Sequence, residues 1–185
     1  NSHVPVFIAQ EKSDENEFRE VDKSNRDETQ KKLHFNRLDL SFKDFSNRNL
    51  NHALFCQVLG AGTNFSGSFL DGSSFIQALL NAAIFQNMNA VGADFNRAIL
   101  TKANITNANL QDANFQFSDL DRADFTGANL EGASFGWADL TGTNFTNANL
   151  TSANFHNAYL SDTVFLNAIV EDCKLPKGLH NYDFT

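Results

Sequence analysis

The feature that most constrains this chain is a period of five residues that runs without a slip from Leu40 to Leu175. Nearly every fifth residue is a large apolar side chain, usually Phe or Leu, and a small residue, most often Ala, stands two positions earlier. The period matches neither the 3.6-residue turn of a helix nor the two-residue alternation of a strand. It matches a coil with four flat sides, in which each pentapeptide supplies one side and its turn.

In such a coil the apolar centre and the small residue before it point inward, and the other positions point outward. Every fourth pentapeptide lies over the same side at the spacing of a β-sheet, so backbone groups of neighbouring coils can pair. The sequence therefore predicts an all-β rod of about seven coils over residues 36–175. The composition agrees, because 19 Phe against 1 Trp and 2 Tyr is a bias that repetition produces.

Two departures from the pattern support a shared interior. At Val58 and Gly60, and again at Met88 and Ala90, the larger residue takes the usual small position and the smaller one takes the centre. Each exchange roughly conserves the volume that the core must fill.

Two charged residues, Lys43 and Arg48, also fall at inward positions. They belong to the first coil, where long side chains can extend out of the open end. We therefore expect irregular geometry before about Asn51.

Pentapeptides such as Ala-Asn-Leu-Gln-Asp at 108–112 and Ala-Asp-Phe-Thr-Gly at 123–127 resemble the repeats of the pentapeptide-repeat family. The resemblance implies a right-handed, quadrilateral β-helix, and the handedness comes from the resemblance alone. Several members of that family resemble duplex DNA in shape and charge and bind type II topoisomerases. A DNA mimic is therefore an alternative function for this chain.

Residues 1–35 break the period and form a predicted non-repeat leader or cap. One interpretation is a polar leader, because acidic and basic side chains dominate the segment. The other is that residues 4–8, Val-Pro-Val-Phe-Ile, dock on the rod as a strap while Leu33 and Phe35 plug its end. An uncapped coil would expose its core and its sheet edge.

Residues 176–185 form a predicted C-terminal cap. Pro176 removes a backbone donor and Gly178 permits a turn, so the repeat stops there. Leu179, Tyr182 and Phe184 can then cover the last coil. The ending Leu-Pro-Lys-Gly at 175–178 resembles the Leu-Pro-Asp-Gly of some cyanobacterial and plastid family members, although Lys177 replaces the acidic residue. The resemblance implies a thylakoid-lumen or periplasmic setting.

The sequence contains no constellation typical of catalysis. Cys56 and Cys173 have no metal-ligand spacing, no His lies beside a Cys or acidic residue at such spacing, and no nucleophile motif is present. We therefore expect a non-enzyme with no catalytic residue, no metal and no cofactor. No apolar stretch is long enough to span a bilayer, so we expect a soluble protein without membrane insertion.

The charge of the chain argues against direct nucleic-acid binding. Its formal net charge is -8, whereas phosphate binding requires clustered Lys and Arg. The acidic charge suits a DNA mimic better, and Asp119 and Asp139 fall on one side of the coil. Lys102 and Arg122 interrupt the same neighbourhood, however, which weighs against that alternative.

An outward apolar stripe is the strongest candidate site. Leu59, Leu79, Ile99 and Tyr159 take one outward position in their coils, where Asn or Asp is usual. The predicted protein-binding stripe consists of Leu54, Leu59, Ile76, Leu79, Ile99, Phe117, Trp137 and Tyr159. Exposed apolar surfaces of this length mark contact sites, and aromatic residues suit interface anchors. The sequence therefore predicts a binding or scaffold module that docks a protein partner or a second copy, unless residues 4–8 already cover the stripe.

Overall fold

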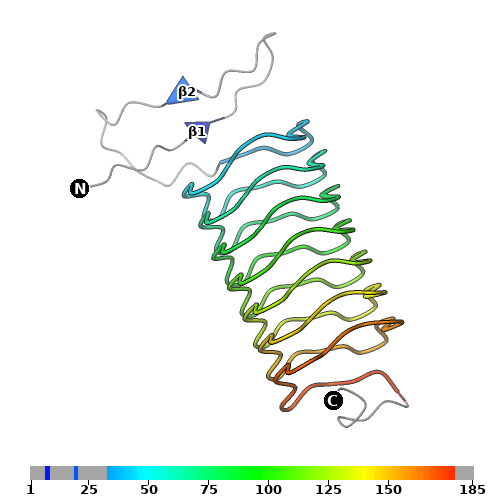
Figure 1. The fold of residues 1–185 in the computed structure, drawn as a ribbon. Helices are drawn as coiled ribbons and strands as arrows, with labels where there is room; N and C mark the ends of the chain where they lie inside the picture. The colour runs from blue at the N-terminus through cyan, green and yellow to red at the C-terminus, as the bar shows by residue number, and fades with distance from the viewer. Residues whose placement is uncertain (1–6, 9–18, 21–32, 178–185) are drawn as a thin grey trace, which may run out of the picture.

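The computed structural model describes residues 7–8, 19–20 and 33–177. Over residues 33–177 the chain winds into a coil whose successive turns lie side by side along a rod (Figure 1). Parallel β-bridges join residues twenty positions apart, from His34 with Leu54 to Asn154 with Lys174. Two short strands outside the coil, β1 (Phe7–Ile8) and β2 (Arg19–Glu20), form an antiparallel pair.

The bridges recur every five residues, so each coil has four sides before the chain returns under itself. We number the sides by their first bridging residue. Side 1 begins at His34, side 2 at Asp39, side 3 at Asp44 and side 4 at Asn49. The bridging residue of each pentapeptide is called its rung residue. It lies directly before the inward centre.

A left-handed residue turns the chain at every corner. Every fifth residue from Arg37 to Asp172 has a positive φ, as the third position of a type II turn requires. The N–H that follows closes the turn, as where Leu38 N donates to Phe35 O at 3.1 Å. Gly and Asn tolerate this backbone well and are frequent here, which explains part of the repeat signal.

Hydrogen bonds between coils satisfy the backbone of each side. Phe55 N donates to Ser74 O at 2.7 Å, and Gln57 N donates to Ile76 O at 2.9 Å. The same two bonds recur on most pentapeptides of the rod. Each coil therefore holds its neighbour in register, and the rung residues of one side form a straight column.

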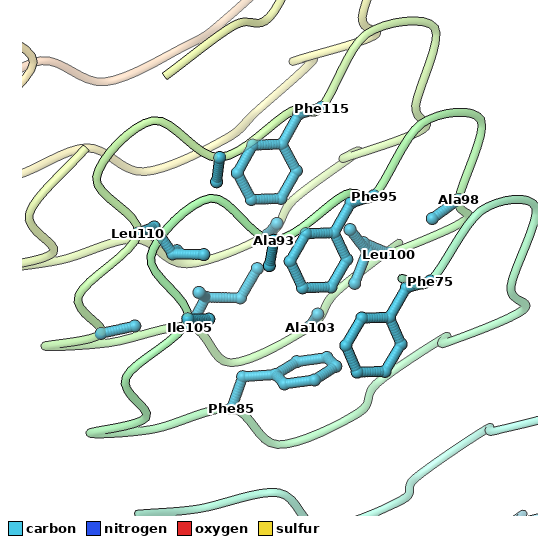
Figure 2. Packing of buried hydrophobic residues seen from close by; sticks show 14 of the residues in the cluster. Phe75, Phe85, Ala93, Phe95, Ala98, Leu100, Ala103, Ile105, Leu110 and Phe115 are labelled. Carbon is cyan, nitrogen blue, oxygen red and sulfur yellow. The ribbon is translucent and has the colours of Figure 1, made fainter. Parts of the chain in front are cut away.

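The interior is filled by columns of side chains. Phe centres lie on sides 1 and 3, and Leu centres lie mainly on sides 2 and 4. Figure 2 shows Phe75, Phe95 and Phe115 stacked along side 1, with centroids 4.8 and 4.9 Å apart. Phe85, from the opposite side, meets Phe95 edge to face at 5.8 Å. Ile105 takes a Phe position on side 3 and is also buried.

The exchanged pairs lie in this core, as the sequence predicts. Val58, Met88 and Ala90 are all buried. A Cβ added to Gly60 would come within 2.8 Å of Leu80 Cδ2, so the Leu80 side chain already occupies that space.

The expectation of irregular geometry before Asn51 is wrong. The rung at His34 and the turn at Arg37 are regular, and Phe35 N donates to Leu54 O at 2.7 Å. Lys43 and Arg48 are half-buried in an undistorted backbone. The bonds to the next coil set the backbone here, and they do not depend on which side chain points inward.

Several expectations concern residues outside the described ranges. The strap of residues 4–8 lies there in part, and so do Gly178, Leu179, Tyr182 and Phe184. Within the described coil, Leu33 and Phe35 are buried. The division into a leader over 1–35, a rod over 36–175 and a cap over 176–185 stays a prediction.

Candidate functional site

The first part of the stripe is a column on side 2. Leu59 bridges to Leu79, and Leu79 bridges to Ile99, so these three side chains occupy consecutive rungs. Leu59 and Leu79 are exposed, and Ile99 is half-buried. We call these three residues the apolar column.

The same column changes character further along the rod. Ile99 bridges to Asp119, Asp119 to Asp139, and Asp139 to Tyr159. The column is therefore acidic between Ile99 and Tyr159. We call Asp119 and Asp139 the acidic rungs.

Phe117 and Trp137 lie beside the acidic rungs, at the turn from side 1 into side 2. Their rings stack with centroids 6.4 Å apart and planes 8° from parallel. Their side chains are 47% and 51% exposed. Both residues adopt a positive φ, which bulky side chains disfavour. The guanidinium of Arg97 lies 5.2 Å from the centre of the Phe117 ring, on the preceding coil. We call Phe117 and Trp137 the aromatic corner.

The corner is polar where the column is apolar. Arg37 Nε donates to Gln57 Oε1 at 2.9 Å, and Gln57 Nε2 donates to Gln77 Oε1 at 2.9 Å. This ladder flanks the apolar column up to Arg97. The apolar surface therefore steps sideways along the rod, from the rungs at Ile99 to the corner at Phe117.

Two predicted stripe residues are neither rungs of side 2 nor members of the aromatic corner. Leu54 is a rung residue of side 1, between His34 and Ser74, and is half-buried. Ile76 follows the buried centre Phe75, precedes Gln77 at the turn from side 1 into side 2, and is also half-buried. The remaining six residues are rungs of side 2 or form the aromatic corner.

The apolar rungs forgo a hydrogen bond that Asp and Asn rungs make. Thr141 N donates to Asp139 Oδ1 at 3.0 Å, and Ser41 N donates to Asp39 Oδ1 at 3.0 Å. The Ser41 backbone bond lowers the pKa of the Asp39 carboxyl from its ordinary value of 3.8. Leu or Ile at this position cannot accept such a bond, so the apolar column gives up local support for the turn.

The structure exposes further apolar side chains that the sequence analysis did not assign. At outward positions they are Phe42, Phe69, Ile84, Val164, Leu166 and Ile169, and Leu38, at an inward position of the first coil, is 38% exposed as well. The six outward residues could have been found by the signal that found the stripe, because each occupies an outward position of its pentapeptide. Their rungs are isolated, however, since Ile84 lies between Asn64 and Asn104 and Phe69 lies between Asn49 and Asn89. Among the described residues, side 2 is the only side with three apolar rung residues in succession.

Phe42 extends the surface of side 2 toward the N-terminal end of the rod. It occupies the trailing corner of side 2 and is 82% exposed. Its ring lies against Gly62 of the next coil, where an added Cβ would come within 2.7 Å of the ring. The absence of a side chain at Gly62 therefore leaves room for the Phe42 ring.

The described part of the chain contains no group of three or more His, Cys, Asp or Glu side chains placed to hold a metal ion. Within the same part, no helix is long and apolar enough to cross a membrane. Cys56 and Cys173 are both free thiols.

Similarity to solved structures is broad but at low TM-scores. HetL, a pentapeptide repeat protein involved in heterocyst differentiation regulation in the cyanobacterium Nostoc sp. strain PCC 7120, is 21% identical. The match covers 80% of this chain and 89% of HetL, with a TM-score of 0.43. Full-length QnrB1, a plasmid-mediated fluoroquinolone resistance protein, is 26% identical over 76% of this chain and 81% of its own, with a TM-score of 0.40.

A pentapeptide repeat protein of the Arabidopsis thaliana thylakoid lumen is 31% identical. That match covers 61% of this chain and 68% of the plant protein, with a TM-score of 0.23. No curated protein sequence matches the chain significantly.

The model of the family described as pentapeptide repeats matches the chain in 8 copies. The matched ranges are 39–77, 73–116, 108–147, 128–167 and 138–175, which together span most of the rod. They coincide with the pentapeptides whose centres fill the core. The chain belongs to the pentapeptide-repeat family.

Proposed function

We propose that this chain is a non-catalytic scaffold module that binds a partner protein through side 2 of its rod. The rod itself would be the right-handed β-helix of about seven coils that membership of the family implies. The observation that carries the proposal is the apolar column. Leu59, Leu79 and Ile99 stand on consecutive rungs where Asp or Asn would support the turn.

Apolar side chains at these rungs carry a double disadvantage for an isolated rod. They give up a turn hydrogen bond, and they place aliphatic surface in water. Isolated apolar rungs elsewhere, such as Phe69, are ordinary surface variation. Three in succession, followed along the rod by an aromatic corner, have the form of an interface core.

The acidic rungs give little support to the alternative of a DNA mimic. Such a mimic needs an array of negative charges that repeats along the rod as phosphates do. On the described sides, Asp119 and Asp139 are the only acidic rungs that adjoin each other. The binding module is therefore the better proposal.

Site-specific photo-crosslinking tests the proposal. A photoreactive residue at Leu79 should crosslink a partner protein in cells of the source organism, whereas the same residue at Phe69 on side 4 should not. Crosslinks to residues 1–10 of the same chain would show an intramolecular cover, and crosslinks between two copies would show a homodimer. Either of these would replace the proposed partner.

A substitution that keeps the fold supplies the control. Leu79→Asn with Ile99→Asn restores the side-chain acceptor at both turns, so the stability should be unchanged or higher. The same pair should abolish partner capture, as should Trp137→Asp. Because the double variant should fold normally, lost capture could not be attributed to unfolding. Equal capture by the wild type and by the double variant would contradict the proposal.

A further inference from the structure

The apolar path on side 2 has chemically different ends. At the apolar column, the flanking corner carries amides and the Arg97 guanidinium. At the aromatic corner, the flanking rungs are Asp119 and Asp139. A partner that follows the path therefore meets neutral or basic groups first and carboxylates second.

Neither acidic rung forms an ion pair within the described residues. Asp119 Oδ1 accepts from Asp121 N at 3.0 Å, and Asp139 Oδ1 accepts from Thr141 N and Thr141 Oγ1. The ion pair found in the described coil joins Arg122 to Asp121 at 3.8 Å and involves neither rung. Adjacent rungs are about 4.8 Å apart, so two like charges face the same solvent. A cation between them would relieve that repulsion.

The aromatic corner offers a second contact for a cation. Phe117 lies between Arg97 and Trp137, and the Arg97 guanidinium already stacks on it. In the described chain, no cation lies over Trp137, and Asn157 occupies the next position of the corner. Trp is the aromatic side chain that attracts a guanidinium or ammonium group most strongly.

We propose that the segment of the partner that docks on side 2 is apolar at one end and basic at the other. Its aliphatic side chains cover Leu59, Leu79 and Ile99. An Arg or Lys at its other end stacks on Trp137 and pairs with Asp119 and Asp139. This inference rests on the proposed function and adds to it the chemistry of the partner and the order of its groups along the rod. Charge complementarity at the second end excludes an acidic segment.

A displayed library of random short peptides, selected on the immobilised full-length chain, tests the proposal. Enriched peptides should carry apolar residues at one end and Arg or Lys at the other. Trp137 is the single Trp of the sequence, so Trp fluorescence reports directly on binding at the aromatic corner. Synthetic copies of the enriched peptides should change that fluorescence, and copies with Glu in place of the basic residues should not.

The control variants retain every turn. Asp119→Asn with Asp139→Asn keeps both Oδ1 acceptors but removes the charge. The double variant should bind the basic peptides about tenfold more weakly, and its affinity should depend less on salt. Asp124→Asn on side 3, whose Oδ1 accepts from Thr126 N in the same way, should leave the affinity unchanged.

The outcomes separate the two proposals. Peptides without basic preference that still need Leu79 would overturn the inference about charge and leave apolar docking intact. Equal binding of the basic peptides to the charge-neutral double variant would do the same. Absence of any enriched peptide that alters Trp137 fluorescence would overturn the inference, while crosslinking at Leu79 decides the proposed function independently.

Discussion

Each inward residue is held by contacts on several sides, which makes single core positions sensitive. Phe125 is fully buried, stacks on Phe145 with centroids 5.2 Å apart and meets Phe115 edge to face at 5.5 Å. Neighbouring coils are fixed by their backbone bonds and cannot collapse into a vacated position. Truncation of a core ring therefore leaves a cavity.

Phe125→Ala should lower the free energy of unfolding by about 3–5 kcal/mol, since the lost apolar burial and the cavity add. Equilibrium denaturation measures this change. Phe69→Ala, which removes a half-exposed ring from a rung on side 4, is the control and should cost much less. A loss below about 1 kcal/mol for Phe125→Ala would contradict its place in the core.

Cys173 shows how the interior alters chemistry at one residue. Its thiol takes an inward position near the end of the rod and donates to Leu150 O at 2.9 Å. Burial, with a smaller contribution from Asp172, raises the pKa of the Cys173 thiol to about 11. The neutral thiol is thus the form that the folded chain holds.

In a Cys56→Ser variant, Cys173 should react slowly with a thiol reagent at neutral to mildly alkaline pH. At pH 8, about one thiol in a thousand is ionised when the pKa is near 11, and the thiolate is the reactive form. The rate should rise steeply in urea, where the ordinary pKa returns. Equal rates in the folded and unfolded chain would show that Cys173 is not held as described.

At the scale of the element, each pentapeptide is a side followed by a left-handed turn. The turn position accepts glycine without strain, Asn at a small cost and most other residues at a larger one. Phe117 and Trp137 accept that cost to bring their rings to the corner. Stacking of the two rings and the contact from Arg97 offset part of it.

Exchanges between alanine and glycine at the turns should have opposite signs. Gly127 has a φ of 69°, and an added Cβ would collide with Asn107 Oδ1, so Gly127→Ala should cost about 1–2 kcal/mol. Ala82, with a φ of 53°, already bears the left-handed strain. Ala82→Gly should be neutral or stabilising by up to about 1 kcal/mol, because relief of strain exceeds the entropy that glycine adds to the unfolded chain.

Thermal or denaturant unfolding of both variants measures these changes. The pair serves as its own control, because both positions are turn positions of one rod. Destabilisation by Ala82→Gly as large as that by Gly127→Ala would contradict the turn geometry.

At the scale of the whole molecule, the rod is a stack in which each coil contacts only its neighbours. Residues twenty apart lie on the same side. An insertion or deletion therefore keeps the register of the stack only if its length is a multiple of twenty residues. Phe then lies over Phe, and Leu over Leu, along each side.

Deletion of residues 81–100 should leave a shorter but regular rod, because the chain rejoins on the same side. Deletion of only residues 81–85 should destabilise the rod more, although fewer residues are lost. It rotates all later coils by one side, so that Phe columns meet Leu columns and stacked pairs across the junction are lost. Denaturation midpoints compare the two deletions, and a lower midpoint for the longer deletion would contradict the register.

The sequence by itself determined the architecture of the rod, because the period of five assigns every residue an inward or an outward position. It identified the column of Leu59, Leu79 and Ile99 for the same reason, since residues twenty apart must share a side. By the same rule Leu54, five residues before Leu59, belongs to the preceding side. Only the tertiary structure showed that Leu54 and Ile99 are half-buried while Leu59 and Leu79 are exposed. It also showed that Arg97, Phe117 and Trp137 stack, because the direction of a side chain at a corner depends on its neighbours on adjacent coils. The regular first coil was missed for a related reason. Periodicity describes which way side chains point, whereas backbone bonds to the next coil set the geometry at Lys43 and Arg48.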